Sequence, residues 1–168
     1  MVFNNFLSTD EIDYILSRNY NYNDGHTNGR TSSRVVQKAD ILSHYPKLNQ
    51  RIFDTIKQLN NAYRYTIENL AQMDLLKYEK GGKYDWHQDV LYNKAKHRKF
   101  SIIIQLSDGK DYKGGDFELR DPYDINLSTF RDKGSMLVFP SFLWHRITPI
   151  KRGKRQSIVS WIEGPPWK

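Results

Sequence analysis

The sequence predicts an α+β chain that is mainly β, with N-terminal helices buttressing a sandwich or jelly roll of short strands. Apolar residues recur at helical spacing in the first third of the chain. Beyond about residue 70 the pattern changes to short apolar runs separated by Gly, Pro, Asp and Asn turns. Helices followed by strands are typical of an α+β arrangement, and this strand spacing suits a jelly roll. The length of 168 residues matches one domain over 1–168, with helical support at about 1–65 and a jelly-roll core at about 70–165.

Two helices are expected before residue 65. The first is predicted near 9–18, because Ser8 and Glu11 form a capping box and Leu7 can staple onto Ile12. The polar segment that follows, Asn19 to Arg34, has no periodicity and is typical of a mobile loop. A second helix is predicted at about 46–61, where Pro46 precedes apolar residues at helical spacing, namely Leu48, Ile52, Phe53, Ile56 and Leu59.

Six strands are predicted in the rest of the chain. They are Met73–Tyr78, Lys99–Leu106, Gly115–Leu119, Met136–Phe139, Trp144–Thr148 and Arg155–Ile162. The basic residues just before the last strand, at 151–154, are expected to form a solvated turn.

Composition excludes several kinds of site. The chain has no cysteine, so disulfides, thiolate zinc sites, iron–sulfur clusters and cysteine nucleophiles are excluded, and any metal must be held by nitrogen and oxygen. No apolar stretch approaches the roughly 20 residues of a membrane-spanning helix, and the first residues lack a signal-peptide pattern. We therefore expect a soluble, cytoplasmic protein. Its formal charge of +7 fits a basic surface or a nucleic-acid partner, and the first interpretation is preferred.

A metal site is indicated by His87-Gln88-Asp89 together with His145. Residues i and i+2 on a strand point to the same face, so His87 and Asp89 can grip one ion. His145 stands at the start of another predicted strand. Two histidines and one carboxylate make a facial triad that leaves adjacent positions on iron open for substrates. Taken alone, the triplet also fits a surface turn, because such triplets arise by chance.

Arg155 adds weight to the metal hypothesis. Alternation along the predicted strand places Arg155, Ser157, Val159 and Trp161 on one face. An arginine aimed into a barrel needs a partner, because a desolvated charge is costly when unpaired. A ligand carboxylate would suit, since the guanidinium binds it bidentately. The alternative is an arginine that reaches solvent at the strand end. In combination with the triad, we favour the ligand.

A longer series of ordered motifs runs from Leu76 to Trp161. Its elements are Tyr78, Gly81-Gly82, Tyr84, His87-Gln88-Asp89, Arg98, Tyr112-Lys113-Gly114-Gly115-Asp116-Phe117-Glu118-Leu119, Gly134, Phe139-Pro140-Ser141, His145-Arg146, Pro149 and Arg155-Gln156-Ser157. This series resembles the iron(II)/2-oxoglutarate-dependent dioxygenases of the prolyl 4-hydroxylase type, and Phe6-Leu7-Ser8 resembles the opening of that family. The resemblance implies a double-stranded β-helix core with the metal inside.

The resemblance also implies roles for individual residues. His87, Asp89 and His145 would be the iron ligands and the catalytic centre. The distal carboxylate of 2-oxoglutarate would be bound by Arg155, helped by Ser157 and the Tyr78 hydroxyl. Around the target proline, the family places side chains that match Tyr84, Arg98 and Trp161, and an aromatic wall suits a pyrrolidine ring. In the 19–34 segment, Tyr20, Tyr22 and Arg30 are candidate peptide contacts.

The implied activity is hydroxylation of a prolyl residue in a peptide or protein, coupled to decarboxylation of 2-oxoglutarate to succinate. Iron(II), 2-oxoglutarate and O2 would be required, with L-ascorbate as a candidate accessory cofactor. Related halogenases lack the carboxylate ligand, so Asp89 favours hydroxylation. One departure concerns Arg155: many collagen-type enzymes have lysine there, whereas oxygen-sensing and bacterial relatives have arginine.

Four other functions are left open by the residues. The same oxygenase chemistry can act on a lysyl residue, a free amino acid or a nucleic acid. Demethylases of the nucleic-acid repair type carry a second arginine where this chain has Trp161, which argues against that substrate. Zinc accepts the same three ligands, so a zinc hydrolase is another candidate, although it would leave Arg155, Ser157 and Tyr78 without a purpose. The non-enzymatic alternative is a β-sandwich binding module.

Overall fold

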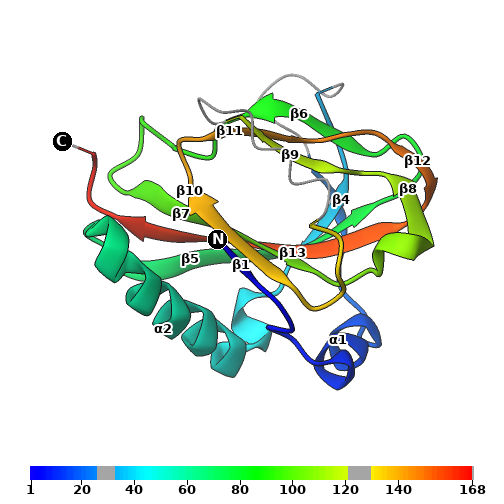
Figure 1. The fold of residues 1–168 in the computed structure, drawn as a ribbon, viewed down its shortest axis with the longest axis horizontal. Coiled ribbons are helices and arrows are strands. Elements are labelled where there is room, and N and C mark those ends of the chain that lie inside the picture. Colours follow the sequence, from blue (N-terminus) through cyan, green and yellow to red (C-terminus); the bar gives the residue numbers. More distant parts are fainter. Residues whose placement is uncertain (26–32, 121–129, 168) are drawn as a thin grey trace.

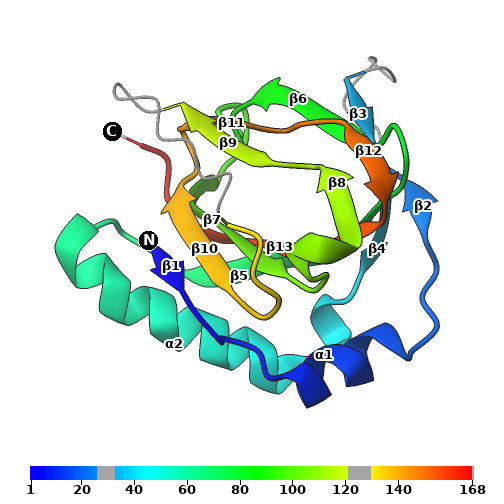
Figure 2. The ribbon, with the colours of Figure 1, turned by 45° about the vertical axis from the view of Figure 1, so that its right-hand side comes forward.

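The computed structural model describes residues 1–25, 33–120 and 130–167. Their strands form two antiparallel sheets that face each other and a short two-stranded ribbon. Both α-helices lie on the outer side of the larger sheet (Figure 1). Seen from a second direction, the two sheets and the ribbon surround the interior like a flattened barrel (Figure 2). The predicted α+β class, with helices packed on a mainly β core, is confirmed.

The two α-helices begin where the sequence predicts. Helix α1 (Thr9–Leu16) is preceded by the expected capping box, in which the Ser8 N–H donates to the Glu11 carboxylate at 2.9 Å and the Glu11 N–H donates to the Ser8 hydroxyl at 3.2 Å. Helix α2 (Pro46–Tyr63) has proline in its first turn, as favoured there, and is followed by its C-cap residue Arg64, which has a positive φ of 57°. Short 3₁₀ turns occur at η1 (Leu42–His44) and η2 (Gly109–Asp111). Among the helices of the described residues, none has the length and apolarity needed to cross a membrane.

The larger sheet has seven strands in the order β1-β10-β7-β13-β5-β4-β2. Their bounds, in chain order, are β1 (Val2–Phe3), β2 (Asn23–Asp24), β4 (Gln37–Asp40), β5 (Asn69–Tyr78), β7 (His97–Gln105), β10 (Met136–Pro140) and β13 (Arg155–Gly164). The smaller sheet has the order β3-β6-β11-β9, formed by β3 (Arg34–Val35), β6 (Lys83–His87), β9 (Phe117–Arg120) and β11 (Trp144–Ile147). The ribbon pairs β8 (Tyr112–Gly114) with β12 (Ile150–Gly153).

All six predicted strands are present, with ends shifted by a few residues. Seven further strands are present. Six of them are two to four residues long and most are polar, and the seventh, β6, lies where the metal hypothesis assumed a strand at His87. Two corrections follow. The segment predicted as a loop at 19–34 contains β2 and the first residue of β3, while residues 26–32 lie outside the described part. The residues at 151–153 are exposed as expected, but they belong to β12 rather than to a turn.

Alternation along the central strands divides the interior into two apolar clusters. On β7, Ile102 and Ile104 pack toward the helices, whereas Ile103 points into the space between the sheets. Strand β13 follows the same rule, with Ile158 on the helix side and Val159 between the sheets. Because both faces of these central strands are buried, their sequences are almost continuous apolar runs. Each fully buried aliphatic side chain contributes about 1.5–3 kcal/mol to folding.

Candidate active site between the two sheets

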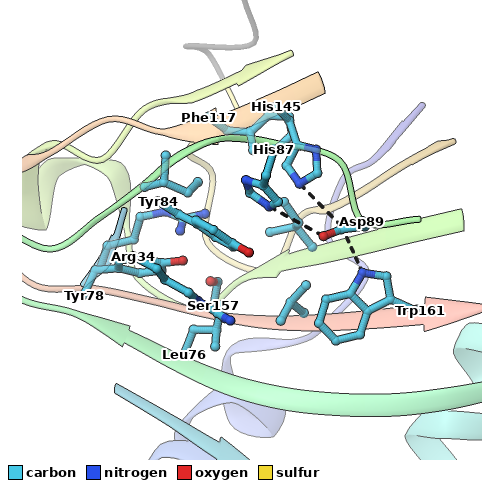
Figure 3. Close-up of a pocket in the computed structure, with 14 residues that line it drawn as sticks. Arg34, Leu76, Tyr78, Tyr84, His87, Asp89, Phe117, His145, Ser157 and Trp161 are labelled. Atoms are coloured by element: carbon cyan, nitrogen blue, oxygen red, sulfur yellow. Dashed lines mark hydrogen bonds and ion pairs between the residues drawn. The ribbon is translucent and has the colours of Figure 1, made fainter. Parts of the chain in front are cut away.

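A pocket with an empty volume of about 420 Å³ lies between the two sheets. Both sheets contribute side chains to its wall, as the close-up shows (Figure 3). The lining residues are Arg34, Leu76, Tyr78, Tyr84, His87, Asp89, Ile103, Phe117, His145, Ile147, Arg155, Ser157, Val159 and Trp161. Eight of the nine residues that the sequence singled out for this site are therefore brought together, and Arg98 lies just outside the lining.

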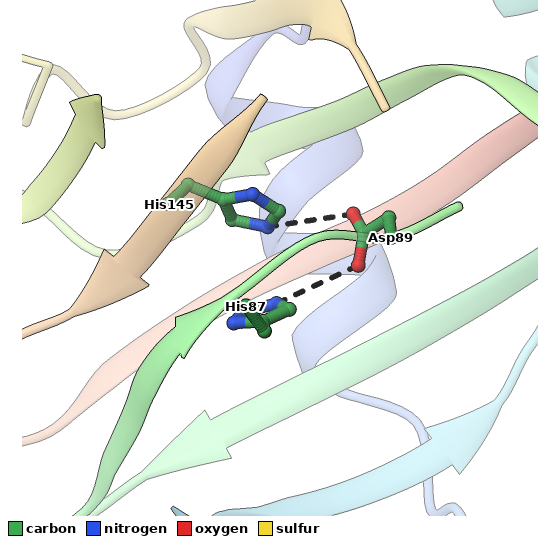
Figure 4. Close-up of side chains that lie close together, drawn as sticks. All are labelled: His87, Asp89 and His145. Atoms are coloured by element: carbon green, nitrogen blue, oxygen red, sulfur yellow. Dashed lines mark ion pairs between the residues drawn. The ribbon is translucent and has the colours of Figure 1, made fainter. Parts of the chain in front are cut away.

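His87, Asp89 and His145 converge at one end of this pocket (Figure 4). Strands β6 and β11 pair so that His87 and His145 are direct neighbours. The His87 Nε2 lies 3.5 Å from Asp89 Oδ1, and the His145 Nε2 lies 3.4 Å from Asp89 Oδ2. One ligand atom from each residue lies within 4.8 Å of the others. The prediction that Asp89 shares a strand with His87 is wrong, because β6 ends at His87. Asp89 lies just beyond that end, where its N–H donates to the Ser141 carbonyl at 2.9 Å.

Both imidazoles are oriented by backbone carbonyls. The Nδ1 of His87 bonds the Asp85 carbonyl at 2.7 Å, and the Nδ1 of His145 bonds the Leu143 carbonyl at 3.0 Å. Because a carbonyl only accepts, these bonds require a proton on Nδ1, so that in the neutral imidazole the Nε2 lone pair is directed at the shared centre. Burial lowers the pKa of His87 below its usual value, which favours the neutral imidazole that a metal needs.

Asp89 is buried and held by two donors on one oxygen. The Ser101 hydroxyl and the Trp161 indole N–H both donate to Oδ2, at 2.7 Å and 2.9 Å. Burial raises the pKa of Asp89, whereas the adjacent His145 and His87, when protonated, lower it well below its ordinary range. When both imidazoles are neutral, the hydrogen bonds from Ser101 and Trp161 stabilise the charged carboxylate. The carboxylate is therefore ionised and fixed in place. Neither donor was predicted for this role; Ser101 carried no signal beyond its place in a buried strand.

Arg98 and Trp161 lie against each other beside this carboxylate. The Arg98 guanidinium carbon lies 3.7 Å from the centre of the Trp161 ring, and Arg98 Nη2 donates to the Gln72 amide oxygen at 3.1 Å. The structure thus packs the two residues together and turns the Trp161 N–H toward Asp89 (Figure 3). Their predicted contact with a substrate stays a prediction.

Arg155 lies at the other end of the pocket and is almost completely buried, with 1% of its surface exposed. Its Nη2 donates to the neutral Gln105 amide oxygen at 2.7 Å, while its Nε has no hydrogen-bond partner. Pairing of β13 with β5 sets Tyr78 beside Arg155, and Ser157 follows on the same face. Burial raises the pKa of Tyr78, so its hydroxyl stays protonated and can donate. Gln105 was missed, since a glutamine in an apolar strand gives no sequence signal for this contact.

Tyr84 covers one side of the histidine end. Its ring stacks on His87, with centres 3.5 Å apart and planes inclined by 17°. On β3, Arg34 places its guanidinium carbon 4.6 Å from the centre of the same ring. Arg34 was also missed as a site residue, because it ends a polar segment without periodicity. Of the candidate peptide contacts in that segment, Tyr20 and Tyr22 pack against the helix-side cluster, and Arg30 lies outside the described residues.

These side chains can perform a defined chemistry. Two imidazoles and one carboxylate form a nitrogen and oxygen ligand set suited to a divalent transition metal, with one side open to the pocket. A buried guanidinium without a carboxylate partner faces the same space, and a buried charge of this kind is stabilised by an anionic ligand.

Comparisons with known proteins agree with this chemistry. A family model described as the 2OG-Fe(II) oxygenase superfamily matches residues 73–163. A PKHD-type hydroxylase of Acidovorax ebreus is 30% identical over 74% of this chain, and one of Synechococcus sp. (strain CC9311) is 36% identical over 52%. The chain spans 64% and 39% of the lengths of these two relatives.

Solved structures share the fold. A Pseudomonas putida prolyl-4-hydroxylase superposes with a TM-score of 0.71 at 18% identity, covering 100% of this chain and 92% of the other. A Trichoplax adhaerens prolyl hydroxylase, in complex with a hypoxia inducible factor peptide fragment, gives a TM-score of 0.72 at 16% identity, covering 96% of this chain and 82% of the other. The double-stranded β-helix core expected from the sequence is confirmed.

Proposed function

The chain belongs to the 2OG-Fe(II) oxygenase superfamily, and from this premise we propose that it hydroxylates a prolyl residue in a peptide or protein, using iron(II), 2-oxoglutarate and O2. One observation carries the proposal. A two-histidine, one-carboxylate cluster and a buried arginine without a carboxylate partner line the same pocket. A metal site and a dicarboxylate site in one cavity are what this oxygenase chemistry requires.

The side chains fit iron. His87 and His145 would bind the metal through Nε2, since each Nδ1 is engaged by a carbonyl. Asp89 would bind through Oδ1, because Oδ2 already receives the N–H of Trp161 and the hydroxyl of Ser101. When bound, iron(II) supplies the activation of O2 that oxidises the substrate. The role of these side chains is to fix the ligand geometry and to leave the pocket side of the metal open.

The far end of the pocket fits 2-oxoglutarate. Arg155 would bind its distal carboxylate, since the guanidinium Nε is buried and lacks a partner. Tyr78 and Ser157 would donate their hydroxyl protons to the same group. A zinc hydrolase would use the three metal ligands but would leave this arginine buried and uncompensated. The expected use of L-ascorbate stays a prediction.

The substrate end of the pocket fits a cyclic, apolar residue. Tyr84 and Trp161 contribute aromatic walls, and Val159 on β13 adds an apolar side chain to the lining. The Trichoplax prolyl hydroxylase binds a peptide fragment, which supports a peptide or protein substrate here. The PKHD-type hydroxylases and the prolyl-4-hydroxylase structure support proline as the target.

A panel of proline-containing peptides tests this proposal. Iron-loaded protein is given O2, 2-oxoglutarate and each peptide, and the products are analysed by tandem mass spectrometry. We expect at least one peptide to gain a single oxygen atom on proline and to stimulate succinate formation. Stimulation by lysine-containing peptides or free amino acids, with no gain on proline, would contradict the proline assignment while leaving the oxygenase chemistry in place.

A further inference from the structure

Arg34 has no part in the chemistry proposed so far, yet it lines the pocket. Strand β3 pairs with β6 so that Arg34 is opposite Tyr84. The Tyr84 ring lies between the Arg34 guanidinium and the imidazole of His87, as the close-up shows (Figure 3). A positive charge is therefore held one aromatic ring away from a proposed metal ligand.

Arg34 also lacks an anionic partner among the described residues. None of the ion pairs within 1–25, 33–120 and 130–167 includes it. Its Nε is buried without a hydrogen-bond partner. A guanidinium in such a pocket is stabilised when an anion binds to it.

The charges of the described residues that line the pocket remain unbalanced after iron and co-substrate have bound. Among these residues, Arg34 and Arg155 are the two cations and Asp89 is the one carboxylate. Burial raises the pKa of Tyr84 to about 12, so that phenol carries no charge at neutral pH. Iron(II) and 2-oxoglutarate carry equal and opposite charges, and their binding leaves one positive charge in excess.

The charge of Arg34 acts on tyrosines at both ends of the pocket, because it opposes the rise in pKa of Tyr78 as well as that of Tyr84. The two ends differ in the donors that they already offer. Arg155, Tyr78 and Ser157 already offer one guanidinium and two hydroxyl donors to the distal carboxylate of 2-oxoglutarate. Arg34 instead extends from the smaller sheet over Tyr84, the aromatic residue proposed to contact the substrate.

We infer that Arg34 binds a carboxylate of the substrate, so that this enzyme prefers substrates carrying an acidic group beside the residue that is oxidised. The carboxylate can be the side chain of an acidic residue next to the target or the α-carboxylate of a free imino acid. The inference rests on the proposed function, because it assumes that 2-oxoglutarate occupies the Arg155 end.

The test measures binding, without turnover. Protein loaded with Mn(II) and 2-oxoglutarate under nitrogen is titrated calorimetrically with two matched pairs of probes. One pair is acetyl-prolyl-glutamate amide and acetyl-prolyl-glutamine amide, and the other is L-proline and L-prolinamide. The titrations are repeated with Arg34→Gln, with Arg34→Lys, which keeps the charge, and with Arg152→Gln, which removes an exposed cation on β12 outside the pocket.

We expect the wild type to bind the acidic member of at least one pair about tenfold more tightly, as one charge-assisted hydrogen bond allows. The preference should disappear in Arg34→Gln, persist in part in Arg34→Lys and be unchanged in Arg152→Gln. The pair that shows it identifies the source of the carboxylate.

Other results would overturn the inference. Equal binding of the acidic and amide probes, no measurable binding of either, or a preference retained in Arg34→Gln would each exclude a substrate carboxylate at Arg34. A loss of 2-oxoglutarate affinity in Arg34→Gln, comparable to that of Arg155→Gln, would assign Arg34 to the co-substrate instead. If the wild type failed to bind Mn(II) and 2-oxoglutarate at all, the proposed function itself would fail. Failure of the proposed function is thus distinguished from failure of the Arg34 inference alone.

Discussion

Replacing Trp161 with phenylalanine tests how the pocket holds its carboxylate. The substitution keeps an aromatic ring but removes the N–H that donates to Asp89 Oδ2 at 2.9 Å. A hydrogen bond to a charged group contributes about 1.5–3 kcal/mol. Ser101 still donates to the same oxygen at 2.7 Å, so we expect the lower end of that range. A loss of about 1.5 kcal/mol corresponds to a roughly tenfold weaker metal affinity, within the span typical of groups that support a metal ligand.

The assay is titration with Mn(II), followed by the electron paramagnetic resonance signal of the free ion. Trp144→Phe serves as the matched control, because Trp144 is 47% exposed and does not line the pocket. Thermal unfolding of both variants separates a loss of packing from a loss of affinity. An unchanged Mn(II) affinity in a folded Trp161→Phe protein would refute the idea that this indole positions Asp89.

Three further substitutions probe the site and the fold. Asp89→Ala should abolish Mn(II) binding and succinate formation while the far-ultraviolet circular dichroism stays native, whereas the exposed Asp85→Ala should leave metal binding intact. Arg155→Gln should raise the dissociation constant for 2-oxoglutarate by about 30-fold or more, as loss of a buried charge-assisted contact costs about 2–5 kcal/mol; calorimetry with Mn(II)-loaded protein measures it. Ile56→Ala should lower the free energy of unfolding in urea by about 2–5 kcal/mol, because Ile56 is completely buried between α2 and the larger sheet.

Much of the site was predictable, because its signals are local. Strand alternation alone puts Arg155 and Ser157 on one face, and the structure places both in the pocket. The His87-Gln88-Asp89 triplet gave the correct cluster for a partly wrong reason, since Asp89 reaches its position from beyond the strand end through the bond of its N–H to Ser141.

The remaining site residues depend on tertiary contacts that leave no local pattern. Gln105 is one buried position in an apolar strand, and only the pairing of β13 with β7 brings it near Arg155. Arg34 ends a polar segment, and only the pairing of β3 with β6 carries it to Tyr84. In both cases the function of the residue follows from a strand partner that is distant in the sequence.

The strands likewise differ in how well the sequence predicts them. Long apolar runs such as those of β7 and β13 were predicted because burial on both faces demands them. Edge strands such as β2 and β3 are two residues long, and apart from Val35 their side chains are polar, as in a loop. Pairing with a longer neighbour, rather than residue preference, makes them strands.

The most direct test of the central proposal is succinate formation by anaerobically iron-loaded protein after addition of O2 and 2-oxoglutarate, with Asp89→Ala measured in parallel. We expect the wild type to form succinate only when iron, O2 and 2-oxoglutarate are all present, and the variant to form none. Equal succinate formation by the two proteins, or none by wild-type protein shown to bind both iron and 2-oxoglutarate, would contradict the assignment of this pocket as an oxygenase active site.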